Sequence, residues 1–119
     1  MRILIALLLA MPLSVQADFN DNLTCAVYHR MMVGHFKYRH MDALVALEQE
    51  KMQAFMKQAR AAAAEEYGDV GEEIFNDEWN ALQASMTDEI NRNYDNVNRL
   101  RYRYDKRCEK LAAEQTSAN

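Results

Sequence analysis

Two closely spaced glycines constrain the fold of this chain more than any other feature. Gly68 and Gly71 are two of only three glycines in 119 residues, and the only proline is Pro12. Long runs rich in Ala, Glu, Met, Gln and Arg, which are good helix formers, lie on both sides of them. Glycine and proline are the strongest interrupters of regular structure, so their scarcity predicts long helices. We therefore expect an all-α protein in which residues 67–71 form the hinge of a helical hairpin.

The first seventeen residues have the pattern of a secretory signal peptide. Arg2 supplies a positive charge, residues 3–11 are apolar, and the small-residue site Val15-x-Ala17 precedes Asp18. The apolar run is shorter than the about 20 residues that cross a bilayer. We expect cleavage after Ala17 and an exported protein that does not span a membrane. It would be periplasmic in a bacterium and secreted otherwise.

The remaining residues, 18–119, are enough for one small domain. Cleavage removes one of 14 basic side chains and leaves all 18 acidic ones. This mildly acidic balance, together with export, argues against nucleic-acid binding. We expect a single helical domain over residues 18–119, with a polar tail from about residue 112 that frays.

Apolar residues recur at alternating steps of three and four on both sides of the hinge. On the first arm, eleven such positions run from Met31 to Glu66, and the two exceptions to the apolar pattern are Glu48 and Glu66 itself. A 3.5-residue period is typical of a coiled-coil-like seam. Its phase continues past Gly34, which favours one bent helix. On the second arm, a phase shift and capping residues predict a kink or break near residues 86–88.

The two cysteines restrict how these helices are arranged. Two cysteines in an exported chain usually pair, so we expect a Cys25–Cys108 disulfide, with free thiols or an intermolecular bond as the alternative. In an up-down-up three-helix bundle the two cysteines would lie at opposite ends, about 45 Å apart for 30-residue helices. Disulfide Cα atoms lie within about 7 Å. This leaves an antiparallel hairpin with long, kinked arms, or an up-down-up-down four-helix bundle broken near residues 36–41 and 86–88.

Charge is segregated along the sequence. Residues 61–91 contain nine acids and no Lys or Arg, whereas residues 92–110 contain seven bases and three acids. In a hairpin this pattern predicts an acidic hinge end and a basic, disulfide-linked end. These ends could dock to oppositely charged partners, or they could be ordinary solvated helix faces. The candidate partner-binding residues are Arg99, Arg101, Tyr102, Arg103 and Arg107. Tyr104 belongs to the apolar stripe and Tyr102 does not, so we expect one of these two to point outward.

Only one segment has metal-ligand chemistry. His29, Met32 and His35 follow one another at i,i+3 steps, so they can share a helix face. Imidazole and thioether ligands suit copper. The alternative is that these are core methionines and surface histidines.

Catalytic and cofactor motifs are missing from the sequence. It lacks Cys-x-x-Cys-His, Gly-x-Ser-x-Gly, Ser-x-x-Lys and His-Glu-x-x-His, so we expect neither a cofactor nor an enzyme. The function that fits best is a small exported, non-enzymatic interaction protein, such as an adaptor, inhibitor or stress-type module. Its partner would be another protein or a second copy, and its basic end also suits anionic surfaces. The alternative is a small-ligand or copper-binding protein that uses residues 29–40.

Overall fold

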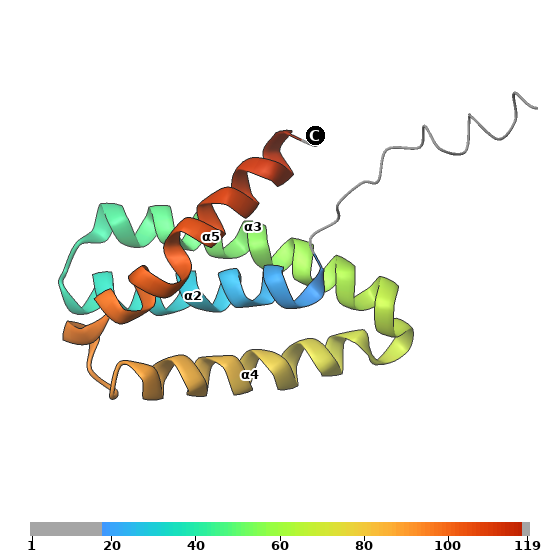
Figure 1. The fold of residues 1–119 in the computed structure, drawn as a ribbon, viewed down its shortest axis with the longest axis horizontal. Helices are drawn as coiled ribbons and strands as arrows, with labels where there is room; N and C mark the ends of the chain where they lie inside the picture. Colours follow the sequence, from blue (N-terminus) through green and yellow to red (C-terminus); the bar gives the residue numbers. More distant parts are fainter. Residues whose placement is uncertain (1–17, 118–119) are drawn as a thin grey trace, which may run out of the picture.

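A computed structural model describes residues 18–117 and shows four α-helices joined by turns (Figure 1). The helices are α2 (Phe19–Tyr38), α3 (Asp42–Tyr67), α4 (Gly71–Glu89) and α5 (Asn98–Ser117), with short 3-10 turns η1 (Gly68–Val70) and η2 (Tyr94–Asn96). The described residues contain no strand, and the all-α prediction is confirmed. No helix within this part of the chain has the length and hydrophobicity needed to cross a bilayer. The predicted signal peptide, residues 1–17, lies outside the described residues.

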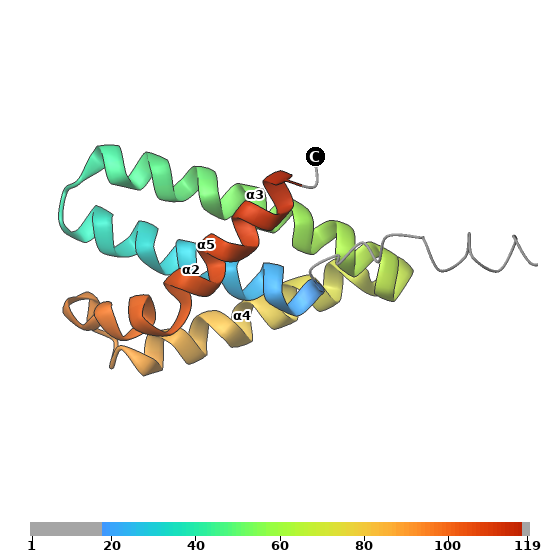
Figure 2. The same ribbon diagram turned by 45° about the horizontal axis from the view of Figure 1, so that its top comes forward.

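The four helices alternate in direction. Figures 1 and 2 show that α2 and α4 run one way and α3 and α5 the other, with α5 lying obliquely across α2. The described chain therefore adopts the four-helix arrangement rather than the two-helix hairpin. The sequence interpretation of one bent helix on the first arm is wrong, because the chain reverses completely between Tyr38 and Asp42.

The reversal after α2 is a helix-terminating motif without glycine. The Met41 amide donates to the Phe36 carbonyl at 2.9 Å, and the His40 amide donates to the Lys37 carbonyl at 3.1 Å. This pair of bonds is the Schellman motif, whose left-handed residue is usually glycine. Here His40 takes that conformation, with φ of 57°. The sequence pattern concealed the turn because the heptad phase continues across it.

A second motif of the same kind ends α4. The Arg92 amide donates to the Thr87 carbonyl and the Asn91 amide to the Asp88 carbonyl, both at 2.9 Å. Asn91 and Arg92 both have positive φ, at 55° and 56°. The helix thus ends at Glu89, next to the break predicted near residues 86–88. The chain then reverses through η2 into α5.

The predicted hinge at residues 67–71 joins α3 to α4. Gly68 has φ of 60° and ψ of −128°, a conformation that L-residues with a Cβ rarely adopt. Gly71 is buried, and a Cβ placed there would lie 2.7 Å from the carbonyl oxygen of Ala63. The first glycine therefore permits the turn, and the second lets α4 approach the backbone of α3.

Helix α2 lies at the centre of the bundle and packs against α3, α4 and α5. Every residue from 22 to 29 on this helix is buried, so it has no continuous solvent-exposed face there. The predicted apolar stripe of the second arm is also confirmed as core. Its members are all buried or half-buried: Phe75, Trp79, Leu82, Met86, Ile90, Tyr94, Val97, Leu100, Tyr104, Cys108 and Leu111.

The predicted disulfide is present and links the central helix to α5. Cys25 and Cys108 are 83 residues apart in sequence, and their Cα atoms lie 5.5 Å apart. Its place in the molecule differs from our expectation. The Phe19 ring at the start of α2 contacts the Tyr67 ring beside the hinge, with centroids 5.8 Å apart. Because each arm folds back on itself, the disulfide lies in the hinge half of the bundle rather than at the opposite end.

Helix α5 extends through much of the stretch for which we expect fraying. It runs to Ser117, and the Gln115 side-chain amide donates to the Asn22 side-chain oxygen at 2.6 Å. This bond ties the end of α5 to the first turns of α2.

Candidate functional site

A buried polar pair links α2 to α3. Nδ1 of His29 lies 2.5 Å from Oε2 of Glu48, and the two residues are only 5% and 9% exposed. The turn at residues 39–41 makes the pair possible because it lays α3 antiparallel against α2 (Figure 1). The ring of Phe55 stacks on the imidazole, with centroids 5.6 Å apart. The position of the His29 ring is thus held by a hydrogen bond along one edge and by an aromatic ring on one face.

A second polar contact links α2 to α5. The Tyr28 hydroxyl donates to Oδ1 of Asp105 at 2.9 Å, and the tyrosine side chain is almost completely buried. Burial raises the pKa of Tyr28 well above its ordinary value, and the negative charges of Asp105 and Glu48 raise it further. The hydroxyl therefore stays protonated and keeps donating to Asp105 across the neutral pH range.

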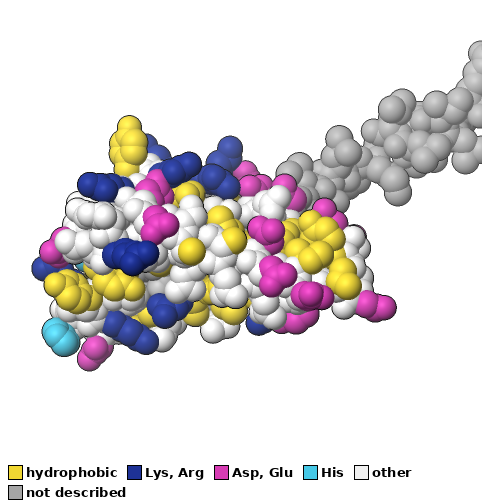
Figure 3. Space-filling view, turned by 90° about the horizontal axis from the view of Figure 1, so that it is seen from below, with side chains coloured by type: hydrophobic (Ala, Val, Ile, Leu, Met, Phe, Trp, Pro, Cys, Tyr) yellow, Lys and Arg dark blue, Asp and Glu magenta, His cyan; other side chains and the backbone are white. Residues whose placement is uncertain are grey.

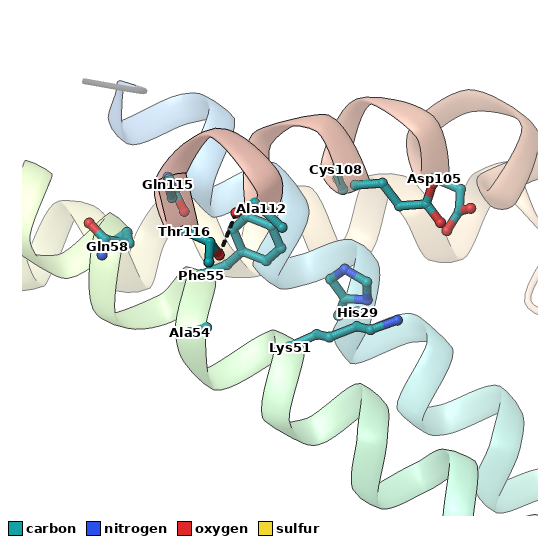
Figure 4. Close-up of a pocket in the computed structure, with 11 residues that line it drawn as sticks. His29, Lys51, Ala54, Phe55, Gln58, Asp105, Cys108, Ala112, Gln115 and Thr116 are labelled. Atoms are coloured by element: carbon teal, nitrogen blue, oxygen red, sulfur yellow. Dashed lines mark hydrogen bonds between the residues drawn. The ribbon is translucent and has the colours of Figure 1, made fainter. Parts of the chain in front are cut away.

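An open cavity of about 240 Å³ lies between α3 and α5 (Figure 4). These two helices pack mainly against α2 rather than against each other, which leaves room between them. Helix α3 contributes Lys51, Ala54, Phe55 and Gln58, helix α5 contributes Asp105, Cys108, Glu109, Ala112, Gln115 and Thr116, and His29 comes from α2. Apolar groups thus share this cavity with acidic, basic and amide groups.

The two ring nitrogens of His29 have different surroundings. Glu48 occupies Nδ1, while Nε2 makes no hydrogen bond with any described residue. In Figure 4 the ring lies between Lys51 on α3 and the helix that carries Asp105. The cavity therefore contains an oriented hydrogen-bonding group.

The predicted copper ligands lie in different surroundings. His29 is bonded to Glu48, Met32 is buried in the core at 2% exposure, and the His35 ring lies beside the Tyr94 ring of η2. His29 thus contacts α3, whereas His35 contacts η2. Residues 18–117 contain no group of three His, Cys, Asp or Glu side chains that could hold a metal ion. Copper binding by His29, Met32 and His35 stays a prediction.

The predicted partner-binding arginines are engaged with their own chain. Arg99 donates to the Glu89 carbonyl at 3.1 Å, and Arg103 donates to the Glu89 carboxylate at 2.6 Å. Arg107 pairs with Asp21 at 3.3 Å. These contacts leave fewer free donors for a partner than the charge pattern suggested.

The two remaining members of that predicted surface differ from each other. Arg101 lies over the ring of Phe36, 5.6 Å from its centroid, although its side chain is exposed. Tyr102 is 96% exposed, whereas Tyr104 is buried at 9%. The expectation that one of these tyrosines points outward is confirmed.

The two ends of the molecule differ in charge. Figure 3 shows Asp and Glu side chains gathered mainly over the hinge end, and Lys and Arg side chains mainly over the opposite end. Ion pairs reduce the contrast at the basic end, where Arg39 pairs with Asp95 and Arg92 with Asp88. The predicted separation of charge is visible on this face, although the disulfide is not part of the basic end.

Apart from His29, which was predicted as a copper ligand, the sequence interpretation missed the residues that line the cavity. Glu48 was the clearest available signal, because an acid on an apolar stripe needs a buried partner. Its pairing with His29 depends on the reversal at residues 39–41, which carried no glycine or proline signal. Asp105 and Glu109 are one helical turn apart on α5, but nothing in the pattern placed α3 across from them.

No protein-family model matches this sequence, and searches of curated proteins and solved structures found no match either. The candidate site is therefore argued from its geometry and chemistry.

Proposed function

We propose that this protein is a small exported, non-enzymatic binding protein, and that its partner occupies the cavity between α3 and α5. One observation carries the proposal: an open cavity contains the His29 imidazole, whose Nδ1 is held by Glu48. Binding sites are concave, largely apolar, and supplied with a few oriented polar groups. The α3–α5 cavity has each of these properties.

The size of the α3–α5 cavity suits a small molecule or one or two side chains of a protein partner. The cavity has a volume of about 240 Å³. This lies just below the usual range for drug-sized ligands. An adaptor or inhibitor that anchors one partner side chain in the cavity therefore fits as well as a carrier of a small solute.

The hydroxyl and the cysteine sulfur in the described lining are both engaged within the chain. Among the described residues that line the cavity, Thr116 carries the only hydroxyl, and it donates to the Ala112 carbonyl at 2.9 Å. Cys108 is in the disulfide. Nucleophilic catalysis needs a nucleophile within reach of a base, and these two groups are otherwise engaged.

The cavity is favoured over the charged ends as the principal site. The predicted arginine surface forms contacts within the chain, which a partner would have to replace. Solvent-exposed ion pairs contribute little energy individually, so the ends could still assist docking. Tyr102 is the most exposed aromatic residue of the predicted arginine surface.

Site-directed photocrosslinking tests this proposal. A photoreactive phenylalanine analogue at Gln58 or Ala112 would lie at the cavity, and the same group at Ala81 would lie on an exposed position of α4. In the exported fraction of the producing cells, we expect specific adducts from the first two positions and none from Ala81. An Ala54→Trp substitution, which fills the cavity, should abolish crosslinking at Ala112. Equal labelling at all three positions, or none at the cavity, would overturn the proposal.

A further inference from the structure

Two carboxylates lie in the lining of the cavity. Asp105 and Glu109 lie one turn apart on α5, and neither forms an ion pair with another described residue. Asp105 accepts from the Tyr28 hydroxyl, which retains its proton and does not cancel the carboxylate charge. The His29 imidazole of α2 lies in the same lining, so the polar groups come from more than one helix.

Among the described residues of the lining, Lys51 is the one Lys or Arg, and an acid lies close to it. Nζ of Lys51 lies 3.8 Å from Oε1 of Glu48, whose other oxygen contacts His29. The remaining charge in the cavity is therefore negative and comes from Asp105 and Glu109. An opposite charge within about 4–6 Å of such groups is stabilised, and an anion is disfavoured.

The apolar part of the lining complements this acidic side. Ala54 and Phe55 on α3 and Ala112 on α5 supply hydrocarbon and aromatic surface in the same cavity. An aromatic ring also favours a neighbouring ammonium or guanidinium group. A ligand with an aliphatic stem and a cationic head group would satisfy both kinds of surface.

We infer that the α3–α5 cavity binds a primary ammonium or guanidinium group carried on a short aliphatic stem. The inference rests on the proposed function and names the chemical class that the cavity recognises. The same chemistry occurs in free alkylamines and in the lysine or arginine side chains of a protein partner. The head group would donate to Asp105 and Glu109, and the stem would lie against Phe55 and Ala112.

Calorimetric titration of the mature protein, residues 18–119, tests this with matched probes. Pentylammonium and agmatine carry the cation, 1-pentanol is a neutral analogue, and pentanoate is an anionic one. We expect binding of the two cations and at least tenfold weaker binding of the other two, the size of one charge-assisted hydrogen bond. Peptides with acetylated and free lysine side chains distinguish a protein source from a free amine. Tighter binding of the free-lysine peptide than of pentylammonium indicates that the natural ligand is a side chain of a protein partner.

Two variants locate the site. Glu109→Gln should weaken pentylammonium binding roughly tenfold, whereas Glu114→Gln, on the same helix but outside the cavity lining, should not change it. The His29 ring resonances should shift on titration with pentylammonium and not with pentanoate. Binding of 1-pentanol as tightly as pentylammonium would overturn the cation inference while leaving the cavity as a binding site. No binding by any probe would also overturn it, and crosslinking at Ala112 then decides the proposed function separately.

Discussion

Nδ1 of His29 lies 2.5 Å from Oε2 of Glu48, although 19 residues and a complete chain reversal separate the two in sequence. Both residues are more than nine-tenths buried. The pair joins the central helix to α3 and orients the imidazole that lines the cavity. Its integrity therefore matters both to the fold and to the proposed binding site.

The losses of stability on removing His29 and on removing Glu48 should be coupled. His29→Ala or Glu48→Ala leaves a buried polar group unsatisfied, which costs about 1–3 kcal/mol in the free energy of unfolding. The double variant should cost less than the sum of the two single changes, with a coupling of about 0.5–3 kcal/mol. Urea denaturation of the four proteins measures this cycle. Lys51→Ala is the control, because its exposed ion pair with Glu48 should contribute under about 1 kcal/mol. Additive single effects would contradict the pairing.

The disulfide should contribute a large share of the stability of this small domain. Closing a loop over 83 residues of separation lowers the entropy of the unfolded chain, which corresponds to about 4 kcal/mol in the chain-entropy model. We expect Cys25→Ala/Cys108→Ala to have a much lower urea midpoint than the oxidised protein. Reductant should lower the midpoint of the native sequence and leave that of the double variant unchanged. A non-reducing mass of two chains would show an intermolecular bond instead.

Substitution of either hinge glycine by alanine should destabilise the protein, but for a different physical reason at each position. Gly71→Ala would place a Cβ 2.7 Å from the Ala63 carbonyl oxygen, a backbone atom that cannot rotate away, and overpacking of this kind costs about 1–3 kcal/mol. Gly68→Ala meets nothing within 4 Å, but the backbone conformation of residue 68, with φ of 60° and ψ of −128°, disfavours an L-residue by about 1–3 kcal/mol. Thermal and urea unfolding of both variants measures the losses. Ala63→Gly should not rescue Gly71→Ala, because the clash is with the backbone, and a rescue would contradict this explanation.

His35 should make the protein less stable below neutral pH. Burial, followed by the positive charges of Arg101 and Arg39, holds the pKa of His35 below its ordinary value of about 6.5. Its Nδ1 is also buried without a hydrogen-bond partner in the described chain. The unfolded chain therefore binds a proton more readily than the folded chain, so this contribution to stability is complete above about pH 6.5 and is lost as the pH falls.

The pH effect can be assigned by comparing two histidines. Urea midpoints at pH 7.5 and 5.5 should fall less for His35→Gln than for the native protein. His40→Gln changes an exposed histidine at the adjacent turn and should keep the native pH dependence. A His35 resonance that titrates at or above its ordinary pKa would refute the assignment.

The sequence by itself determined the helical class, the hinge at Gly68 and Gly71, the disulfide and the apolar stripe of the second arm. These features depend on local chemistry: glycine conformational freedom, cysteine pairing and a repeating spacing of apolar side chains. Even the odd position of Glu48 on the stripe was visible as an exception. Each of these signals is contained within a short stretch of chain or in a single pair of residues.

Only the tertiary structure decided that the chain reverses near both predicted breaks rather than continuing as two long kinked arms, and therefore which polar groups meet. His40 and Asn91 adopt left-handed conformations that carry no glycine signature, because backbone hydrogen bonds and packing stabilise them. Those two turns bring Glu48 to His29 and move the disulfide into the hinge half. They also leave α3 and α5 apart across the cavity. A periodic pattern specifies the buried face of a helix but not its neighbour, since burial is non-directional and many pairings satisfy it equally.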